Sequence, residues 1–163
     1  MAGMGGFEFS GLKDLQKNME KLQGQDLEGF VESCAKELAA RLLAKTVKRT
    51  PVGQYASGSG KKGGALRRGW TSQKGGGSEG LETGSAAQFA DTLQVSHFGN
   101  IYVIEIVNPV EYASYVEYGH RTADHKGWVR GQFMLTISER EIEQAAPKIL
   151  EKKIKKFLGD AFK

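Results

Sequence analysis

Glycine is concentrated in one part of this chain and separates two kinds of hydrophobic pattern. The sequence has 22 glycines in 163 residues, and between residues 53 and 84 they alternate with Ser, Lys and Thr. Such stretches bury little apolar area, so we expect flexible loops at about 53–64 and 74–85. Apolar residues recur with a helical period before this region and with a period near two after it. The pattern therefore predicts helices before the glycine-rich region and strands directly after it.

Three helices are predicted, two before the glycine-rich region and one near the end of the chain. Apolar residues at three- and four-residue spacing predict helices over 10–24 and 26–50, the second capped by Asp26 and ended by Pro51. A long closing helix begins near Gln132 or Phe133, and its lysine-rich end suits a helix C-terminus. Cys34 falls in the apolar stripe of the second helix, so we expect a small buried side chain there rather than a reactive thiol.

Strands are predicted in the middle of the chain. Residues 66–72 can form an edge strand, and residues 89–95 alternate in part. A turn at Phe98-Gly99-Asn100 leads into residues 101–107, which predicts an antiparallel hairpin. The strand over 101–107 is apolar on both faces, so we expect helices to cover one face and a neighbouring subunit to be a candidate cover for the other.

A short helical turn is predicted after these strands. Tyr112, Tyr115 and Val116 lie at three-to-four spacing and should pack this turn against the sheet, before Gly119 permits a positive φ or a close backbone approach. The following residues, 120–127, form a polar and charged loop.

The order of elements predicts an α+β fold. A small antiparallel sheet is packed by N-terminal helices and a long C-terminal helix, with a long flexible basic loop. The length of 163 residues fits one domain over 1–163.

Charge is distributed in zones along the sequence. Residues 48–75 carry seven cations and no acid, residues 76–147 carry four cations and ten acids, and residues 148–163 carry six cations and two acids. Opposed zones suit surfaces that meet complementary surfaces. The alternative is a solvated loop and a solvated helix end.

Composition excludes a membrane span and indicates a reducing compartment. The most apolar stretch, residues 101–107, is interrupted by Glu105 and is far shorter than the ~20 residues that a spanning helix needs. The N-terminus has no basic region followed by a long apolar run, so we expect no signal peptide. Cys34 is the single cysteine, which excludes an internal disulfide framework and agrees with synthesis in a cytoplasm.

No catalytic, cofactor or metal site is predicted. Gly60-Lys61 is followed by Lys62 and lacks the spacing of a phosphate-binding loop. His120 and His125 lie in a polar loop without a third ligand. No serine or cysteine has a histidine and an acid in a recognisable catalytic context.

A nucleic-acid-binding module is the alternative function. The cations between Lys48 and Lys74 are interleaved with Tyr55 and Trp70, which could contact phosphates and stack on bases. Against it, no known reader motif is present, and the acidic middle of the chain would repel a phosphate backbone.

Three segments resemble one protein family. They are Thr50-Pro51-Val52-Gly53 followed by Gly64-Ala65-Leu66-Arg67-Arg68-Gly69-Trp70, then Tyr112-Ala113-Ser114-Tyr115-Val116-Glu117-Tyr118-Gly119, then Gly131-Gln132-Phe133-Met134-Leu135. Together they resemble the gene-product-ten-like tail-completion, or neck, family of tailed bacteriophages. The sequence departs from the family pattern at residues 54–63, an insertion that lengthens the basic loop.

The resemblance implies a non-enzymatic structural virion protein made in the bacterial host cytoplasm. Such a protein would form a homo-oligomeric ring of about six or twelve copies between head connector and tail, because head-to-tail contacts must close. Its implied partners are neighbouring neck, connector, tail terminator or tail tube proteins, with genome DNA passing nearby without specific binding. The candidate interface residues are Lys61, Lys62, Arg67, Arg68, Trp70, Tyr112, Tyr115, Glu117, Tyr118 and Gly119.

Overall fold

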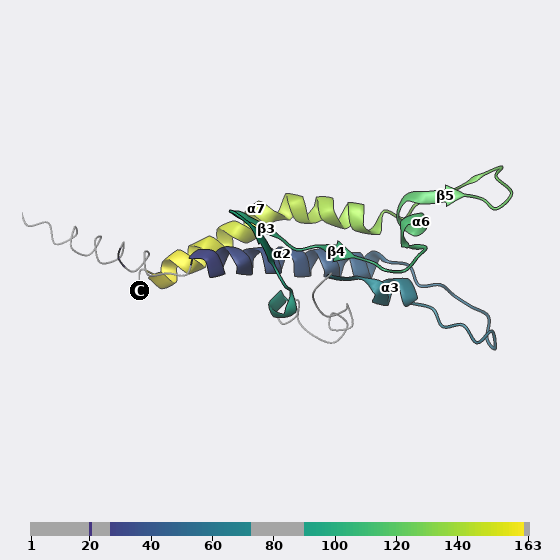
Figure 1. The fold of residues 1–163 in the computed structure, drawn as a ribbon, viewed down its shortest axis with the longest axis horizontal. Helices are drawn as coiled ribbons and strands as arrows, with labels where there is room; N and C mark the ends of the chain where they lie inside the picture. The colour runs from purple at the N-terminus through teal and green to yellow at the C-terminus, as the bar shows by residue number, and fades with distance from the viewer. Residues whose placement is uncertain (1–19, 21–26, 73–89, 162–163) are drawn as a thin grey trace, which may run out of the picture.

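Two long antiparallel helices are the main structural element of the molecule. The computed structural model describes residues 20, 27–72 and 90–161. Helix α2 (Leu27–Arg49) and helix α7 (Met134–Ala161) lie side by side along the long axis (Figure 1). The Phe30 and Phe157 rings stack at 4.3 Å at one end of the pair. At the other end, Arg49 donates a hydrogen bond to the Ser138 hydroxyl at 2.9 Å.

Both long helices agree closely with the sequence prediction. Helix α2 ends one residue before Thr50, whose N–H donates to the Thr46 carbonyl oxygen at 2.9 Å, and Pro51 follows. Helix α7 contains Pro147, which has no N–H to donate to the preceding turn. The helix changes direction along its length in Figure 1, as a proline inside a helix favours. Of the predicted helix over 10–24, only Glu20 lies within the described residues, and it is helical.

The strands form three small antiparallel pairs. Strand β1 (Thr71–Ser72) pairs with β4 (Ile106–Val107), β2 (Ser96–Phe98) pairs with β3 (Ile101–Val103), and β5 (Gly119–Arg121) pairs with β6 (Trp128–Arg130). Long helices packed with small antiparallel sheets make this an α+β fold, which confirms the predicted class.

The predicted hairpin is present, with different strand limits. Gly99, at φ 61°, forms the turn between β2 and β3, and Phe98 pairs with Ile101. The predicted strand over 89–95 is wrong for its described residues, because 90–92 form a helical turn and 93–95 precede the strand, which begins at Ser96. The predicted strand over 101–107 is divided, because β3 and β4 pair with two different neighbours.

Two further segments differ from the sequence prediction. Of the predicted edge strand over 66–72, residues 71–72 do form strand β1, but residues 66–69 belong to helix α3 (Ala65–Gly69), which places Leu66 in the core while Arg67 reaches the end of α2. The polar segment over 120–127 is the turn end of the β5–β6 hairpin rather than a loop throughout.

The core lies where α2, α3 and the start of α7 meet. It is a cluster of buried side chains from these elements and from the segment before β2: Ala39, Ala40, Leu43, Val47, Leu66, Trp70, Ala90, Leu93 and Met134. Cys34 is buried, as predicted. Burial raises the pKa of the Cys34 thiol, and the positive charge of Lys153 opposes this only in part.

Candidate assembly surfaces

A buried glutamate joins helix α6 (Ala113–Tyr118) to the start of α7. The Glu117 side chain is only 4% exposed. Its carboxylate accepts hydrogen bonds from the Leu135 N–H at 3.0 Å, the Thr136 N–H at 2.9 Å and the Thr136 hydroxyl at 2.7 Å. Two of these donors are among the first N–H groups of α7, which have no partner inside the helix. Glu117 therefore caps α7 and fixes α6 against it.

Two glycines allow the β5–β6 hairpin to leave this junction. Gly119 has φ 87°, and a Cβ added there would lie 2.4 Å from the Val129 carbonyl oxygen. A Cβ added at Gly131 would lie 2.3 Å from the Glu117 carbonyl oxygen. Neither position has room for a side chain, so the base of the hairpin is held by close backbone contacts.

A second junction fixes helix α3 to the end of α2. The Trp70 indole N–H donates to the Thr50 hydroxyl oxygen at 2.7 Å, and this hydroxyl donates to the Thr46 carbonyl oxygen at 2.7 Å. The Arg67 guanidinium donates two hydrogen bonds to the Thr50 carbonyl oxygen, at 3.1 and 2.7 Å. Because carbonyl groups at a helix C-terminus lack partners within the helix, Arg67 stabilises the end of α2.

The β5–β6 hairpin and the end of α6 that precedes it carry exposed aromatic and apolar side chains. Tyr118, the last residue of α6, is 62% exposed; in β6, Trp128 is 63% exposed and Val129 is also exposed. His120 pairs with Val129, and the Tyr115 ring lies 5.7 Å from the His120 ring. Since neighbouring residues of a strand point to opposite faces, Trp128 and Val129 show that both faces of this hairpin lack cover. We call Tyr115, Tyr118, Trp128 and Val129 the hairpin surface.

The basic loop, which we define as residues 50–64 between α2 and α3, extends from the same end of the molecule as this hairpin (Figure 1). Every residue from 51 to 62 is exposed, and the Lys61 ammonium lies 5.9 Å from the centre of the Tyr55 ring. Lys62 of the loop and Tyr112 beside α6 line one cavity of about 240 Å³. The loop and the α6 region therefore adjoin.

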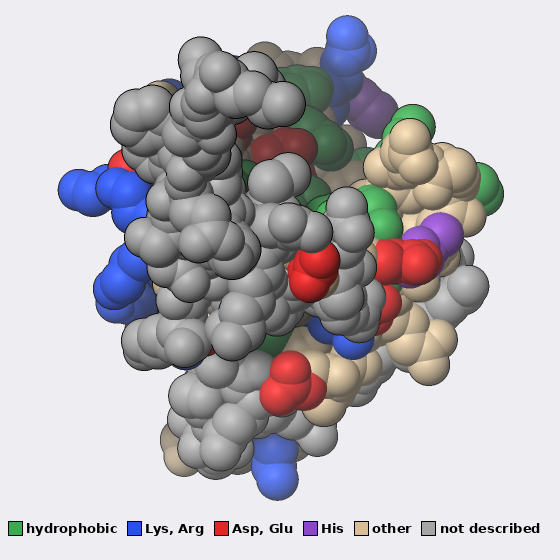
Figure 2. Space-filling model, turned by 90° about the vertical axis from the view of Figure 1, so that its left-hand side faces the viewer, with side chains coloured by type: hydrophobic (Ala, Val, Ile, Leu, Met, Phe, Trp, Pro, Cys, Tyr) green, Lys and Arg blue, Asp and Glu red, His purple; other side chains and the backbone are tan. Residues whose placement is uncertain are grey.

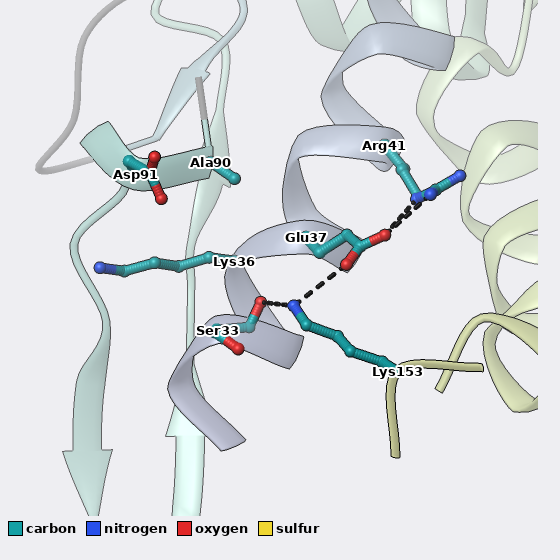
Figure 3. A pocket seen from close by; sticks show the side chains of 7 residues that line it. All are labelled: Ser33, Lys36, Glu37, Arg41, Ala90, Asp91 and Lys153. Atoms are coloured by element: carbon teal, nitrogen blue, oxygen red, sulfur yellow. Dashed lines mark hydrogen bonds and ion pairs between the residues drawn. The ribbon is translucent and has the colours of Figure 1, made fainter. Parts of the chain in front are cut away.

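One ion pair and one hydrogen bond, both made by Lys153 of α7, hold α7 against α2 on the side shown in Figure 3. Glu37 lies between Arg41 and Lys153, with nitrogen to oxygen distances of 2.7 and 3.0 Å, and Lys153 also donates to the Ser33 carbonyl oxygen. Burial raises the pKa of Glu37, but the hydrogen bonds from Arg41 and Lys153 outweigh this and leave that pKa below its ordinary value. These side chains line a pocket together with Lys36 and Asp91, and because Arg41 and Lys153 already bind the Glu37 carboxylate, the arrangement around Glu37 is structural.

Comparison with protein families decides the affiliation of the chain. The HK97-gp10-like family model, described as "Bacteriophage HK97-gp10, putative tail-component", matches residues 13–119. The chain belongs to this family. No curated protein and no solved structure matches it.

In this phage tail-component protein, several of the candidate interface residues make contacts within the chain. Trp70 is 4% exposed, Arg67 is half-buried on Thr50, and Glu117 is buried on Thr136. The family-like segments therefore coincide with the two junctions. Their hydrogen bonds join parts of the sequence 17 to 20 residues apart, which a linear pattern does not display.

The other candidate residues lie at the surface, with two different surroundings. Lys61, Lys62 and Arg68 belong to the basic loop and its base, where Arg68 donates to the Gly63 carbonyl oxygen at 3.3 Å. Tyr112, Tyr115 and Tyr118 are exposed beside or within α6. The predicted packing of Tyr112 and Tyr115 against the sheet is wrong, since their side chains are 44% and 58% exposed, whereas Val116 does pack against the core.

Sequence reasoning missed Trp128 and Val129, which lie in a strand of only three residues. A Trp-Val pair between two arginine-containing polar segments was the available signal. Among the described residues, no group of three or more His, Cys, Asp or Glu could hold a metal ion. No helix in the described ranges is both long and apolar enough to cross a membrane.

Proposed function

We propose that this tail-component protein is a non-enzymatic structural part of the virion, within the neck or tail-completion ring that joins the head connector to the tail. The observation that carries the proposal is the hairpin surface. A two-stranded hairpin is marginally stable by itself, and here both faces carry exposed aromatic or apolar groups. A hairpin that is fixed at its base and exposes apolar groups on both faces is suited to bind another protein that covers these groups.

The basic loop supports the same function. It has no acid and few apolar residues to offset a backbone ordering cost of ~1–2 kcal/mol per residue. We propose that it orders on acidic groups of an adjacent subunit or ring, at the end of the molecule where the hairpin surface also lies. Direct contact with the genome ranks lower, because a strongly basic lumen would retain the DNA that must pass through.

The test is incorporation into particles produced with variants of the hairpin surface. Tyr118→Ser and Trp128→Ser should leave the soluble protein folded and reduce its copy number in purified particles. Lys126→Ser, in the turn of the same hairpin, is a matched control that keeps the aromatic groups. Normal incorporation of both aromatic variants would contradict a role of this hairpin in assembly.

A measurement of DNA affinity separates the alternative function. If the wild-type protein binds duplex DNA tightly with a steep dependence on salt, and is absent from particles, the nucleic-acid-binding module replaces the present proposal.

A further inference from the structure

Three lysines in the second half of α7 have no acidic partner among the residues that the structure describes. Lys148, Lys152 and Lys156 are exposed and recur every four residues, so successive side chains lie about 6 Å apart along one side of the helix. No ion pair reaches any of them from the described part of the chain, whereas their neighbours Lys153 and Lys155 are bound to Glu37 and Glu151. We call Lys148, Lys152 and Lys156 the lysine strip.

The lysine strip borders a groove between α2 and α7. The groove has a volume of about 650 Å³, and half-buried Ala145 and Ile149 contribute apolar surface to it. Among the described residues that line the groove, Glu37 is the one carboxylate, and Arg41 and Lys153 already bind it. The groove therefore favours an occupant that brings both carboxylates and apolar side chains.

The first half of α7 carries a complementary feature. Glu139 and Glu143 are exposed, lie four residues apart and form no ion pair with another described residue. At 3.6 residues per turn, Glu143 points roughly 140° away from Lys148 around the helix. The two glutamates therefore face away from the lysine strip of their own chain.

In a view along the long axis, Lys and Arg side chains project at the left edge and also at the top and bottom, while acidic side chains lie mainly across the middle and right (Figure 2). The opposed charges that matter here are those on α7 itself, where the glutamates and the lysine strip lie on different sides of one helix. Two oppositely charged sides of one helix suit a heterologous contact, in which one side of a copy meets the other side of the next.

We propose that Glu139 and Glu143 of one copy dock on the lysine strip of the next copy. The two carboxylates and the lysines share the same spacing of about 6 Å, so two salt bridges form in one register. Exposed Pro147, four residues after Glu143, adds an apolar group beside the two carboxylates, whereas a nucleic-acid backbone supplies little apolar surface to Ala145 and Ile149. Repetition of this head-to-tail contact gives the subunit-to-subunit interface of the ring, and the inference therefore rests on the proposed function.

Cross-linking in purified particles tests the contact. In a Cys34→Ala background, particles are made with the Glu143→Cys/Lys152→Cys chain and exposed to mild oxidant. The two positions face different sides of one helix, so a disulfide between them joins two copies. We expect a ladder of covalent oligomers, with monomer only for Glu143→Cys in the same background. Particles that contain the doubly substituted chain but give no ladder would overturn the inference and leave the proposed function standing. Absence of the unsubstituted chain from particles would overturn the proposed function itself.

Charge reversal gives an independent measurement. K152E/K156E should reduce incorporation at least tenfold, and the quadruple variant E139K/E143K/K152E/K156E should restore it. If K152E/K156E incorporates normally while retention on duplex DNA falls, the lysine strip is a nucleic-acid contact and the inference is wrong. If the quadruple variant fails although its melting temperature is unchanged, the proposed pairing is also wrong.

Discussion

The Glu117 carboxylate accepts hydrogen bonds from both the backbone N–H and the hydroxyl of Thr136, at 2.9 and 2.7 Å. A single buried side chain therefore holds helix α6 and the first turn of helix α7 together. The β5–β6 hairpin follows α6 directly in the sequence, so this contact also determines the position of the hairpin surface.

Removal of the Glu117 carboxylate should destabilise the protein. Glu117→Ala leaves three buried or half-buried donors without their acceptor, and we expect a loss of about 2–4 kcal/mol in the free energy of unfolding. Glu117→Gln keeps one carbonyl oxygen but turns an amide group toward N–H donors, so its loss should be smaller. Urea denaturation measures both. An unchanged free energy for Glu117→Ala would contradict the capping role.

The hydrogen bond from Trp70 to Thr50 should contribute to stability apart from the size of the indole. Trp70→Phe removes this donor and should cost about 1–3 kcal/mol. Trp70→Ala also opens a cavity and should cost about 3–5 kcal/mol. Thermal denaturation of Tyr55→Phe, an exposed aromatic in the basic loop, serves as the reference and should match the wild type. Equal stability of Trp70→Phe and the wild type would show that the hydrogen bond from Trp70 to Thr50 does not contribute to stability.

Residues of the hairpin surface should affect assembly rather than folding. Tyr115→Ala, Tyr118→Ser and Trp128→Ser alter exposed side chains, so each should change the free energy of unfolding by no more than about 0.5 kcal/mol. Their melting temperatures can be compared with that of Trp70→Ala, a truncation of a buried aromatic. A large drop for Tyr115→Ala would show that this side chain packs within the chain after all.

Deletion of residues 55–63 should leave the fold intact. The loop ends meet, since a Cβ added at Gly63 would lie 2.1 Å from the Gly53 carbonyl oxygen, and the deleted residues contribute nothing to the core. We expect a nearly unchanged melting temperature together with reduced incorporation into particles. An unfolded deletion variant, or particles that assemble normally and fail only at DNA passage, would contradict an assembly role for the loop.

Stability should fall in acid partly through Glu37. The folded-state pKa of Glu37 lies below its ordinary value, so the unfolded chain binds the proton more readily than the folded protein does. The contribution of Glu37 is therefore present above the ordinary carboxyl pKa of about 4.5 and is lost as the pH falls through the lower folded-state pKa. Denaturation at pH 7 and pH 3 should show wild type more stable than Glu37→Gln at the higher pH, with a smaller difference at the lower pH. A difference that is independent of pH would exclude this linkage.

Local signals were sufficient to predict the main elements. Pro51 marked the end of α2, Gly99 marked the β2–β3 turn, and helical spacing predicted the long α7 within two residues of its start. Each of these signals acts within a few residues of the chain, where propensity and turn chemistry have their effect.

Contacts between distant segments could not be predicted in the same way. Leu66 and Trp70 suit a strand locally, and helix α3 forms because Arg67 and Trp70 must both reach Thr50. The spacing of Tyr115 resembles a packed helical face, yet the buried residue of α6 is Glu117, whose partners begin 18 residues later. The candidate residues therefore lie in the segments that form the two junctions, the basic loop and the base of the hairpin, while the contacts of each residue depend on the tertiary structure.

The copy number of the chain in purified particles tests the central claim most directly. Quantitative mass spectrometry on particles from a host that produces the encoded phage or tail-like structure should find the chain at a constant ratio to a major tail protein. The account predicts a whole ring, on the order of six or twelve copies per particle, in every preparation. Absence of the chain from particles, or a copy number that varies between preparations, would contradict it.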